Sequence, residues 1–107
     1  AAFRDAEALQ LLHDILKEAK ALCDANDIEF IVVYLPRREA FDSEEPSARN
    51  QVMDITTALS IPLVDIQDTF ADEEEPLRLF PRPRIFHHYR PEGYQVVADA
   101  VARQLRE

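Results

Sequence analysis

One short segment of the chain is almost wholly apolar: Ile28 to Pro36 reads IEFIVVYLP, with Glu29 as its only charged residue. The segment is rich in β-branched and aromatic residues, and such a run is typical of a strand in a parallel sheet that helices cover on both faces. Because Pro36 cannot donate a hydrogen bond to a neighbouring strand, we expect the strand to end just before it. The segment therefore predicts an α/β fold.

Apolar residues at helical spacing predict the covering elements. We expect helices over about residues 3–25, 44–59 and 91–106. The first should end near Ala25-Asn26-Asp27, where Asn26 tolerates a left-handed backbone, and the second should be capped by Ser43 or Ser47. The third begins with Pro91, which suits the first helical position. Its expected buried face consists of Tyr94, Val97, Ala98, Val101 and Leu105.

A second apolar run, IPLVDI at residues 61–66, completes the predicted sheet. The strands at about 28–35 and 61–66, joined through the helix at 44–59, form a right-handed parallel βαβ unit. Residues 67–84 read as a long irregular connection, and long ordered loops are often functional. No internal repeat or domain boundary interrupts the 107 residues, so we expect one small domain.

Composition excludes several classes of function. Twelve basic and 21 acidic side chains give a net charge of −9, which disfavours binding to nucleic acid or to anionic lipid. No apolar stretch approaches the ~20 residues of a membrane span, and the first ten residues lack the features of a signal peptide. The single cysteine, Cys23, cannot form an intrachain disulfide. These features indicate a soluble protein.

A sheet of two strands has two open edges, and soluble α/β domains rarely leave such edges bare. The chain also starts without an initiating methionine. We therefore expect it to be the C-terminal portion of a larger domain, with the missing N-terminal half or another chain covering the open edge.

The segment before the last helix carries the strongest functional signal. His88 to Tyr94 reads HYRPEGY, and a histidine just ahead of a helix can act as a general base near neutral pH. Gly93, the only glycine, lies inside the helix at a cost of ~1 kcal/mol in propensity, which suggests a close backbone approach.

In its order of elements and in this block, the chain resembles the C-terminal half of an SGNH (GDSL-type) hydrolase. That family ends with Asp-x-x-His, an aromatic residue or leucine, a polar residue, two variable residues, glycine, then histidine or tyrosine. His88 to Tyr94 matches from the histidine onward. The resemblance implies a partial three-layer flavodoxin-like sandwich and a serine esterase, acyl hydrolase or acyltransferase-like activity, with His88 as the catalytic base. It implies an acyl ester of a carbohydrate or lipid as substrate, and no metal or organic cofactor.

Two departures from the family pattern bear on activity. Ile85 stands where the family has the aspartate that orients the histidine, and Asp65, Asp68 or Asp72 are the candidate replacements. The blocks that hold the nucleophilic serine and the oxyanion hole belong to the family's N-terminal half and do not appear here. We expect the 107 residues alone to be inactive, and the alternative reading is a non-catalytic α/β interaction module that keeps this scaffold.

Other candidate residues have simpler interpretations. His87 is expected to face solvent, His13 to lie at the rim of the first helix's apolar face, and Cys23 to be a small hydrophobic residue. Asp72 to Glu75 could join the histidines in a metal site, but no ligand spacing supports one, so a solvated loop is favoured. Pro81 to Arg84 could bind an anion or pair with the acidic run, although an extended linker fits better.

Overall fold

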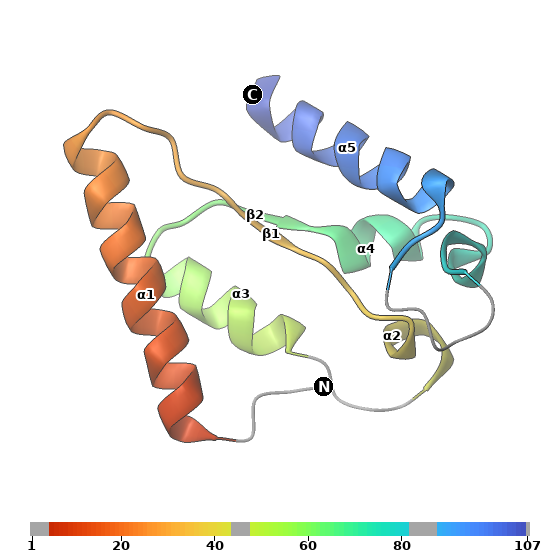
Figure 1. Ribbon diagram of the computed structural model, residues 1–107, viewed down its shortest axis with the longest axis horizontal. Helices are drawn as coiled ribbons and strands as arrows, with labels where there is room; N and C mark the ends of the chain where they lie inside the picture. The colour runs from red at the N-terminus through yellow and green to blue at the C-terminus, as the bar shows by residue number, and fades with distance from the viewer. Residues whose placement is uncertain (1–4, 44–47, 82–87, 107) are drawn as a thin grey trace. The chain divides into compact units, whose positions relative to one another are not determined.

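A computed structural model describes residues 5–43, 48–81 and 88–106 (Figure 1). In chain order, the elements are α1 (Ala6–Ala25), β1 (Val32–Tyr34), α2 (Glu39–Asp42), α3 (Arg49–Ala58), β2 (Leu63–Asp65), α4 (Ile66–Ala71), the 3₁₀ helix η1 (Pro76–Leu79) and α5 (Pro91–Arg106). The described part is mostly helical, and β1 pairs with β2 in a parallel sheet. The α/β class and the parallel strand pair are therefore confirmed.

Both strands are shorter than predicted. Only Val32–Tyr34 of the run 28–35 forms a strand, and its three side chains are half-buried rather than covered on both faces. The first residue of the run, Ile28, instead closes α1, because its backbone N–H donates to the carbonyl of Cys23 at 2.8 Å. The second strand ends at Asp65, where α4 begins.

The two helices that precede strands end in the same way. After α1, Asp27 takes a left-handed backbone with φ of 54°, and after α3, Ser60 does so with φ of 57°. The N–H of Ile61 donates to the carbonyl of Thr56 at 2.8 Å, as that of Ile28 does to Cys23. This is the Schellman arrangement, which satisfies carbonyls left over at a helix end. The left-handed residue after α1 is thus Asp27, not the predicted Asn26.

The polar segments contain more helix than the sequence predicted. Ser43, one of the two predicted caps, ends the short helix α2, and the other predicted cap lies outside the described residues. Helix α3 begins after Ala48, which makes no side-chain capping bond. The connection predicted to be irregular holds α4 and η1. Proline at the start of η1 and the Asp65 side chain at the start of α4 favour these turns locally.

The chain divides into two compact units, each with its own core. The first unit comprises residues 1–32 and 47–63, and its buried side chains are Val52, Ile55, Thr56 and Ile61. The hydroxyl of Thr56 donates to the carbonyl of Val52 at 3.0 Å, so this buried polar group is satisfied.

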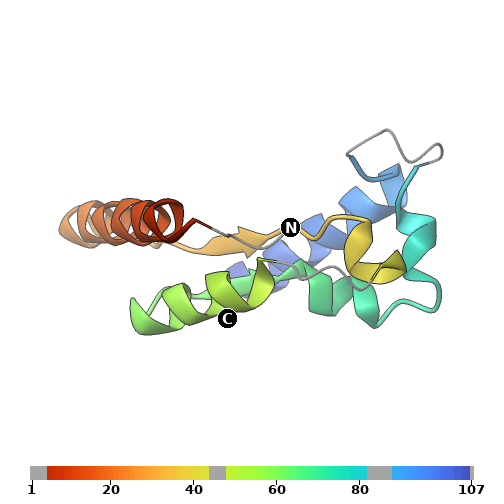
Figure 2. The ribbon, with the colours of Figure 1, turned by 90° about the horizontal axis from the view of Figure 1, so that it is seen from below.

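The second unit comprises residues 33–46 and 64–107, and aromatic rings fill its core. Phe70 is fully buried, and its ring centroid lies 6.3 Å from that of Phe41, 5.9 Å from that of Phe80 and 5.0 Å from that of Tyr89. Phe41 comes from α2, Phe70 from α4 and Phe80 from the end of η1, and Tyr89 lies two residues before the start of α5. Helix α2 lies beside η1, which also contacts α4 and α5 (Figures 1 and 2). The ring cluster therefore joins the short elements of this unit.

Helix α5 has the predicted bounds but a different buried face. Gly93 and Ala100 are its buried residues, whereas Tyr94, Ala98 and Leu105 are exposed, contrary to prediction. Val97 and Val101 are half-buried. Small residues lie at the closest contacts because η1 and α4 pack tightly against the helix. The buried face of α5 therefore centres on the small residues Gly93 and Ala100 and not on its large apolar side chains.

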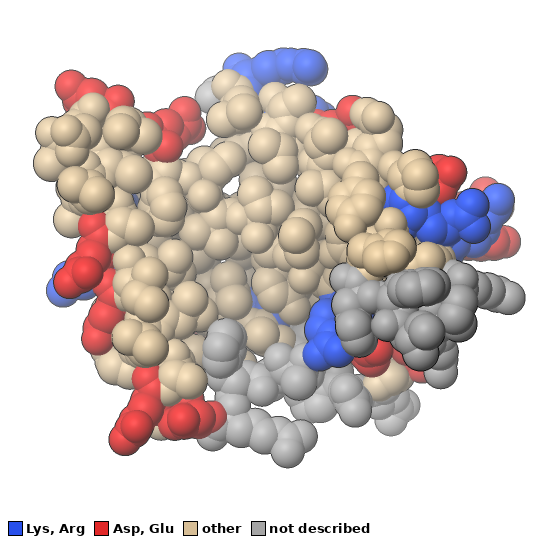
Figure 3. Space-filling view, viewed as in Figure 1, with Lys and Arg blue, Asp and Glu red and all other residues tan. Residues whose placement is uncertain are grey.

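Helix α1 is amphipathic but has no buried residue among those described. The most covered side of the helix holds half-buried residues, namely Leu9, Leu12, Leu16, Ala19 and Cys23. A second apolar row is exposed, with Leu11 at 59% and Leu22 at 67% of their full accessibility. Acidic side chains follow the side of α1 at the left of Figure 3. None of the described helices is both long and apolar enough to span a bilayer.

We predict that Phe70→Ala lowers the free energy of unfolding by about 3–5 kcal/mol, because it empties the centre of the ring cluster. Urea denaturation followed by circular dichroism measures the change. The control Leu22→Ala removes an exposed side chain and should change stability by no more than about 0.5 kcal/mol. A loss below about 1 kcal/mol for Phe70→Ala would contradict the central position of this ring.

Candidate functional site

His88 lies at the start of the segment that leads into α5, three residues before Pro91, and it is exposed. Its Nδ1 lies 3.1 Å from the backbone carbonyl oxygen of Tyr89. A carbonyl only accepts hydrogen bonds, so this contact requires a proton on Nδ1. In the neutral ring, Nε2 then carries the lone pair, which is the nitrogen that a general base uses in a serine hydrolase.

Tyr89 is the anchor of this segment. Its side chain is 8% exposed, and its hydroxyl donates to the carbonyl of Pro36 at 2.6 Å. Its ring meets those of Phe70 and Phe80 edge to face, at centroid distances of 5.0 and 5.3 Å. Such contacts add to the stabilisation from buried area alone. The residue next to His88 is thus fixed at both its ring and its hydroxyl.

The peptide unit between Tyr89 and Arg90 is held on both sides. Its N–H, that of Arg90, donates to the carbonyl of Leu79 at 2.8 Å, while its carbonyl faces the Nδ1 of His88. Because a peptide unit is planar, fixing the N–H also fixes the direction of the carbonyl. The imidazole therefore meets an acceptor whose orientation is set by η1.

The close packing around Gly93 explains why this position holds a glycine. A Cβ added at this position would lie 2.8 Å from the Cβ of Tyr89 and 2.9 Å from the carbonyl oxygen of Leu79. Both distances are too short for ordinary contacts, so a side chain would force the helix away from η1. The predicted close backbone approach is confirmed, and the neighbour is η1.

The three candidate carboxylates lie around α4. Asp65 accepts a hydrogen bond from the backbone N–H of Asp68 at 3.4 Å and so caps this helix. Asp68 is exposed in the first turn, and Asp72 is exposed at the C-terminal end. Ile85 and His87 lie outside the described residues. Asp65 thus already has a structural task at the end of β2.

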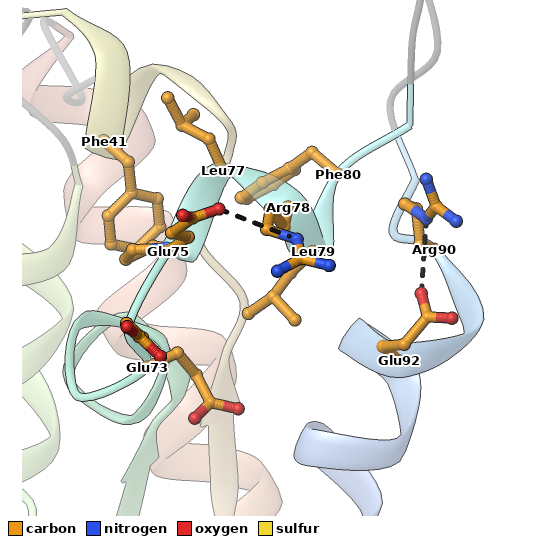
Figure 4. Close-up of a pocket in the computed structure, with 11 residues that line it drawn as sticks. Phe41, Glu73, Glu75, Leu77, Arg78, Leu79, Phe80, Arg90 and Glu92 are labelled. Atoms are coloured by element: carbon orange, nitrogen blue, oxygen red, sulfur yellow. Dashed lines mark hydrogen bonds and ion pairs between the residues drawn. The ribbon is translucent and has the colours of Figure 1, made fainter.

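An open groove of about 990 Å³ lies beside this segment (Figure 4). Its apolar walls include Phe41, Leu77, Leu79 and Phe80, and its charged lining consists of Glu73, Glu74, Glu75, Arg78, Arg90 and Glu92. The arginines pair with glutamates of the same groove, Arg78 with Glu75 at 3.7 Å and Arg90 with Glu92 at 3.2 Å. The lining therefore carries a net negative charge next to apolar walls.

The remaining sequence candidates have ordinary surroundings. His13 is half-buried on α1, and its Nδ1 lies 3.0 Å from the carboxylate of Asp14. Hydrogen bonds from His13 and then Gln10 lower the pKa of Asp14. Cys23 is half-buried, and residues 72–75 are exposed. Across residues 5–43, 48–81 and 88–106, no three metal-ligating side chains gather in one place.

The predicted linker or anion-binding segment, residues 81–84, lies mostly outside the described residues. Of the segment 81–84, only Pro81 is described, and its carbonyl lies 3.4 Å from a guanidinium nitrogen of Arg38. Arg38 also forms an ion pair with Asp42 at 3.0 Å, in which both side chains are mostly buried. This pair helps to hold α2 beside the chain that follows η1.

Sequence reasoning missed the role of Tyr89. The resemblance covered this position only as "aromatic or leucine", which suits packing but says nothing of a hydroxyl. The signal that remains in the sequence is that the residue is a tyrosine rather than phenylalanine, since buried tyrosines usually find a hydrogen-bond partner. Its acceptor, Pro36, is 53 residues away in the chain.

A scan against protein-family models gives no match to this chain, and searches of curated proteins and of solved structures give none either.

We predict that Gly93→Ala destabilises the protein by about 1–3 kcal/mol, although alanine is the better helix former. The added methyl group would press on Tyr89 and on the carbonyl of Leu79. Urea midpoints measure the effect. Gln95→Ala, at an exposed position two residues along the same helix, is the control and should be close to neutral. A more stable Gly93→Ala variant would show that η1 does not constrain this position.

We also predict a stability loss at alkaline pH that depends on Tyr89. Burial, followed by the nearby Tyr94 and Tyr34 phenols, raises the pKa of Tyr89 above its ordinary value. The folded state therefore favours the neutral phenol. The contribution of Tyr89 to the free energy of unfolding is complete below about pH 10 and declines as the pH rises further. The stability difference between the wild type and Tyr89→Phe should stay constant from pH 8 to about pH 10 and narrow above it. With Phe80→Leu, which removes no titrating group, the difference should stay constant.

Proposed function

We propose that these 107 residues are the C-terminal portion of an SGNH-type serine esterase, acyl hydrolase or acyltransferase-like domain, and that His88 is its general base. The observation that carries the proposal is the contact between His88 Nδ1 and the Tyr89 carbonyl at 3.1 Å, which selects the tautomer with its lone pair on Nε2. In the complete domain, further strands and helices would extend the βαβ unit into a three-layer flavodoxin-like sandwich.

The place of the histidine in the fold supports this proposal. The Tyr89 hydroxyl binds the carbonyl of Pro36, two residues beyond the end of β1, and so ties the segment to the carboxyl end of that strand. In open α/β sheets, ligands bind outside the carboxyl ends of the strands. An imidazole just before α5 is then close to where a substrate would approach.

The reaction that fits is acyl transfer. A serine from the N-terminal portion would attack the ester carbonyl while Nε2 of His88 takes the hydroxyl proton, and the resulting imidazolium would then return that proton to the leaving alcohol. Water would repeat the sequence on the acyl-enzyme to release the acid. As the resemblance implies, the substrates would be esters of carbohydrates or lipids.

The Tyr89 carbonyl would take over part of the task of the aspartate that Ile85 replaces. It can accept the Nδ1–H and so orient the ring, as the carboxylate does in a triad. A neutral carbonyl, however, stabilises the imidazolium less than a negative charge would. Proton transfer by His88 should therefore be slower than in enzymes with the full triad.

A second candidate function is a non-catalytic interaction module. Leu11, Ile15 and Leu22 form an exposed apolar row along α1, and surfaces of this kind often contact other proteins. In this alternative, His88 would be a remnant of the scaffold and Ile85 would reflect the loss of catalysis.

The test is hydrolysis of a short activated ester by the full-length protein that contains these residues. We predict that His88→Ala lowers kcat/KM by at least ~10²-fold, which is the usual contribution of a general base. His13→Ala removes an imidazole from α1 and should leave the rate unchanged. Full activity in His88→Ala would exclude the proposed role, and an inert full-length protein with an intact serine block would favour the interaction module.

The isolated 107 residues should show no turnover above that of free imidazole. A lone base lacks the nucleophile and the preorganised oxyanion donors that supply most of the rate acceleration.

A further inference from the structure

Two anchors converge on the peptide unit that faces His88. Leu79 accepts from the Arg90 N–H at 2.8 Å, and the Tyr89 side chain is held by the carbonyl of Pro36 at 2.6 Å. The first anchor comes from η1, and the second comes from the chain just beyond β1. The first bond fixes the peptide unit that contains the Tyr89 carbonyl, and the second fixes the Tyr89 side chain, so the carbonyl has little freedom to rotate.

We propose that Tyr89 is the positioning residue of this site: its hydroxyl bond to Pro36 holds its own backbone carbonyl against Nδ1 of His88 and thereby sets the tautomer of the base. This inference rests on the proposed function, because a tautomer matters only if His88 transfers protons. The same residue thus accepts from the imidazole through its main chain and donates to β1's end through its side chain.

Packing around Tyr89 supports a role beyond filling space. A phenylalanine would satisfy the edge-to-face contacts with Phe70 and Phe80 equally well, since those contacts involve only the ring. The hydroxyl adds one directional bond to a carbonyl of the buried residue Pro36. Gly93 contributes from the other side, because its missing side chain lets the Tyr89 Cβ lie against α5. Ring position alone therefore does not require the tyrosine.

The experiment is two-bond ¹H–¹⁵N NMR of the ¹⁵N-histidine-labelled 107-residue chain at a pH where imidazole is neutral. Such spectra report which ring nitrogen carries the proton, and the His88 signals are assigned by their loss in His88→Ala. We expect the wild type to hold His88 mainly as the Nδ1–H tautomer. In Tyr89→Phe, the ratio of the Nδ1–H to the Nε2–H form should fall roughly fivefold, the equivalent of losing one ordinary neutral hydrogen bond.

Two controls separate positioning from general loosening. Tyr94→Phe removes a hydroxyl from the exposed tyrosine whose ring lies 5.3 Å from that of Tyr89, and it should leave the ratio unchanged. Ile55→Val removes a methyl group from the core of the first unit, and it should lower stability while the ratio stays constant.

An unchanged ratio in a folded Tyr89→Phe would overturn the inference. So would a wild-type spectrum in which the Nε2–H form of His88 dominates, and this measurement stands even if the variant fails to fold. Neither readout uses catalysis, so failure here is distinct from failure of the proposed function. A fivefold shift together with full esterase activity in His88→Ala would reject the catalytic role of His88, while the positioning of its ring by Tyr89 would stand.

Discussion

The hydrogen bond from the Tyr89 hydroxyl to the Pro36 carbonyl is the contact on which the described site depends. It joins the end of β1 to the segment before α5, across 53 residues of sequence. The rings of Phe70 and Phe80 exclude water from around the phenol, which strengthens the bond and makes an unpaired Pro36 carbonyl costly. Because His88 directly precedes Tyr89 in the chain, the same contact that stabilises the second unit also places the candidate base.

This arrangement shows how a site can keep an oriented imidazole without a carboxylate at the expected position. A triad aspartate orients the ring and offsets its charge, and these are separable tasks. Here a backbone carbonyl can perform the first, and two hydrogen bonds hold it in place: that of the Arg90 N–H to Leu79 of η1 and that of the Tyr89 hydroxyl to Pro36.

The sequence predicted the features that arise from local patterns. Helices α1 and α5 were found because their apolar periodicity extends over several turns, and Gly93 was recognised because glycine is unfavourable inside a helix. The predicted strand at 28–35 is longer than the observed one, because an apolar run does not show that Ile28 closes the preceding helix. The partners of Tyr89 were not predicted, because a contact between residues 36 and 89 depends on the tertiary fold.

The lack of any buried residue on α1 has a consequence for how the protein opens. A helix held by half-buried side chains can detach at a small fraction of the global unfolding free energy, because little apolar surface is newly wetted. Amide protons of α1 should then exchange with solvent well before those of the aromatic core. Proteases would also be expected to cut there first, leaving the ring-centred unit as the more resistant fragment.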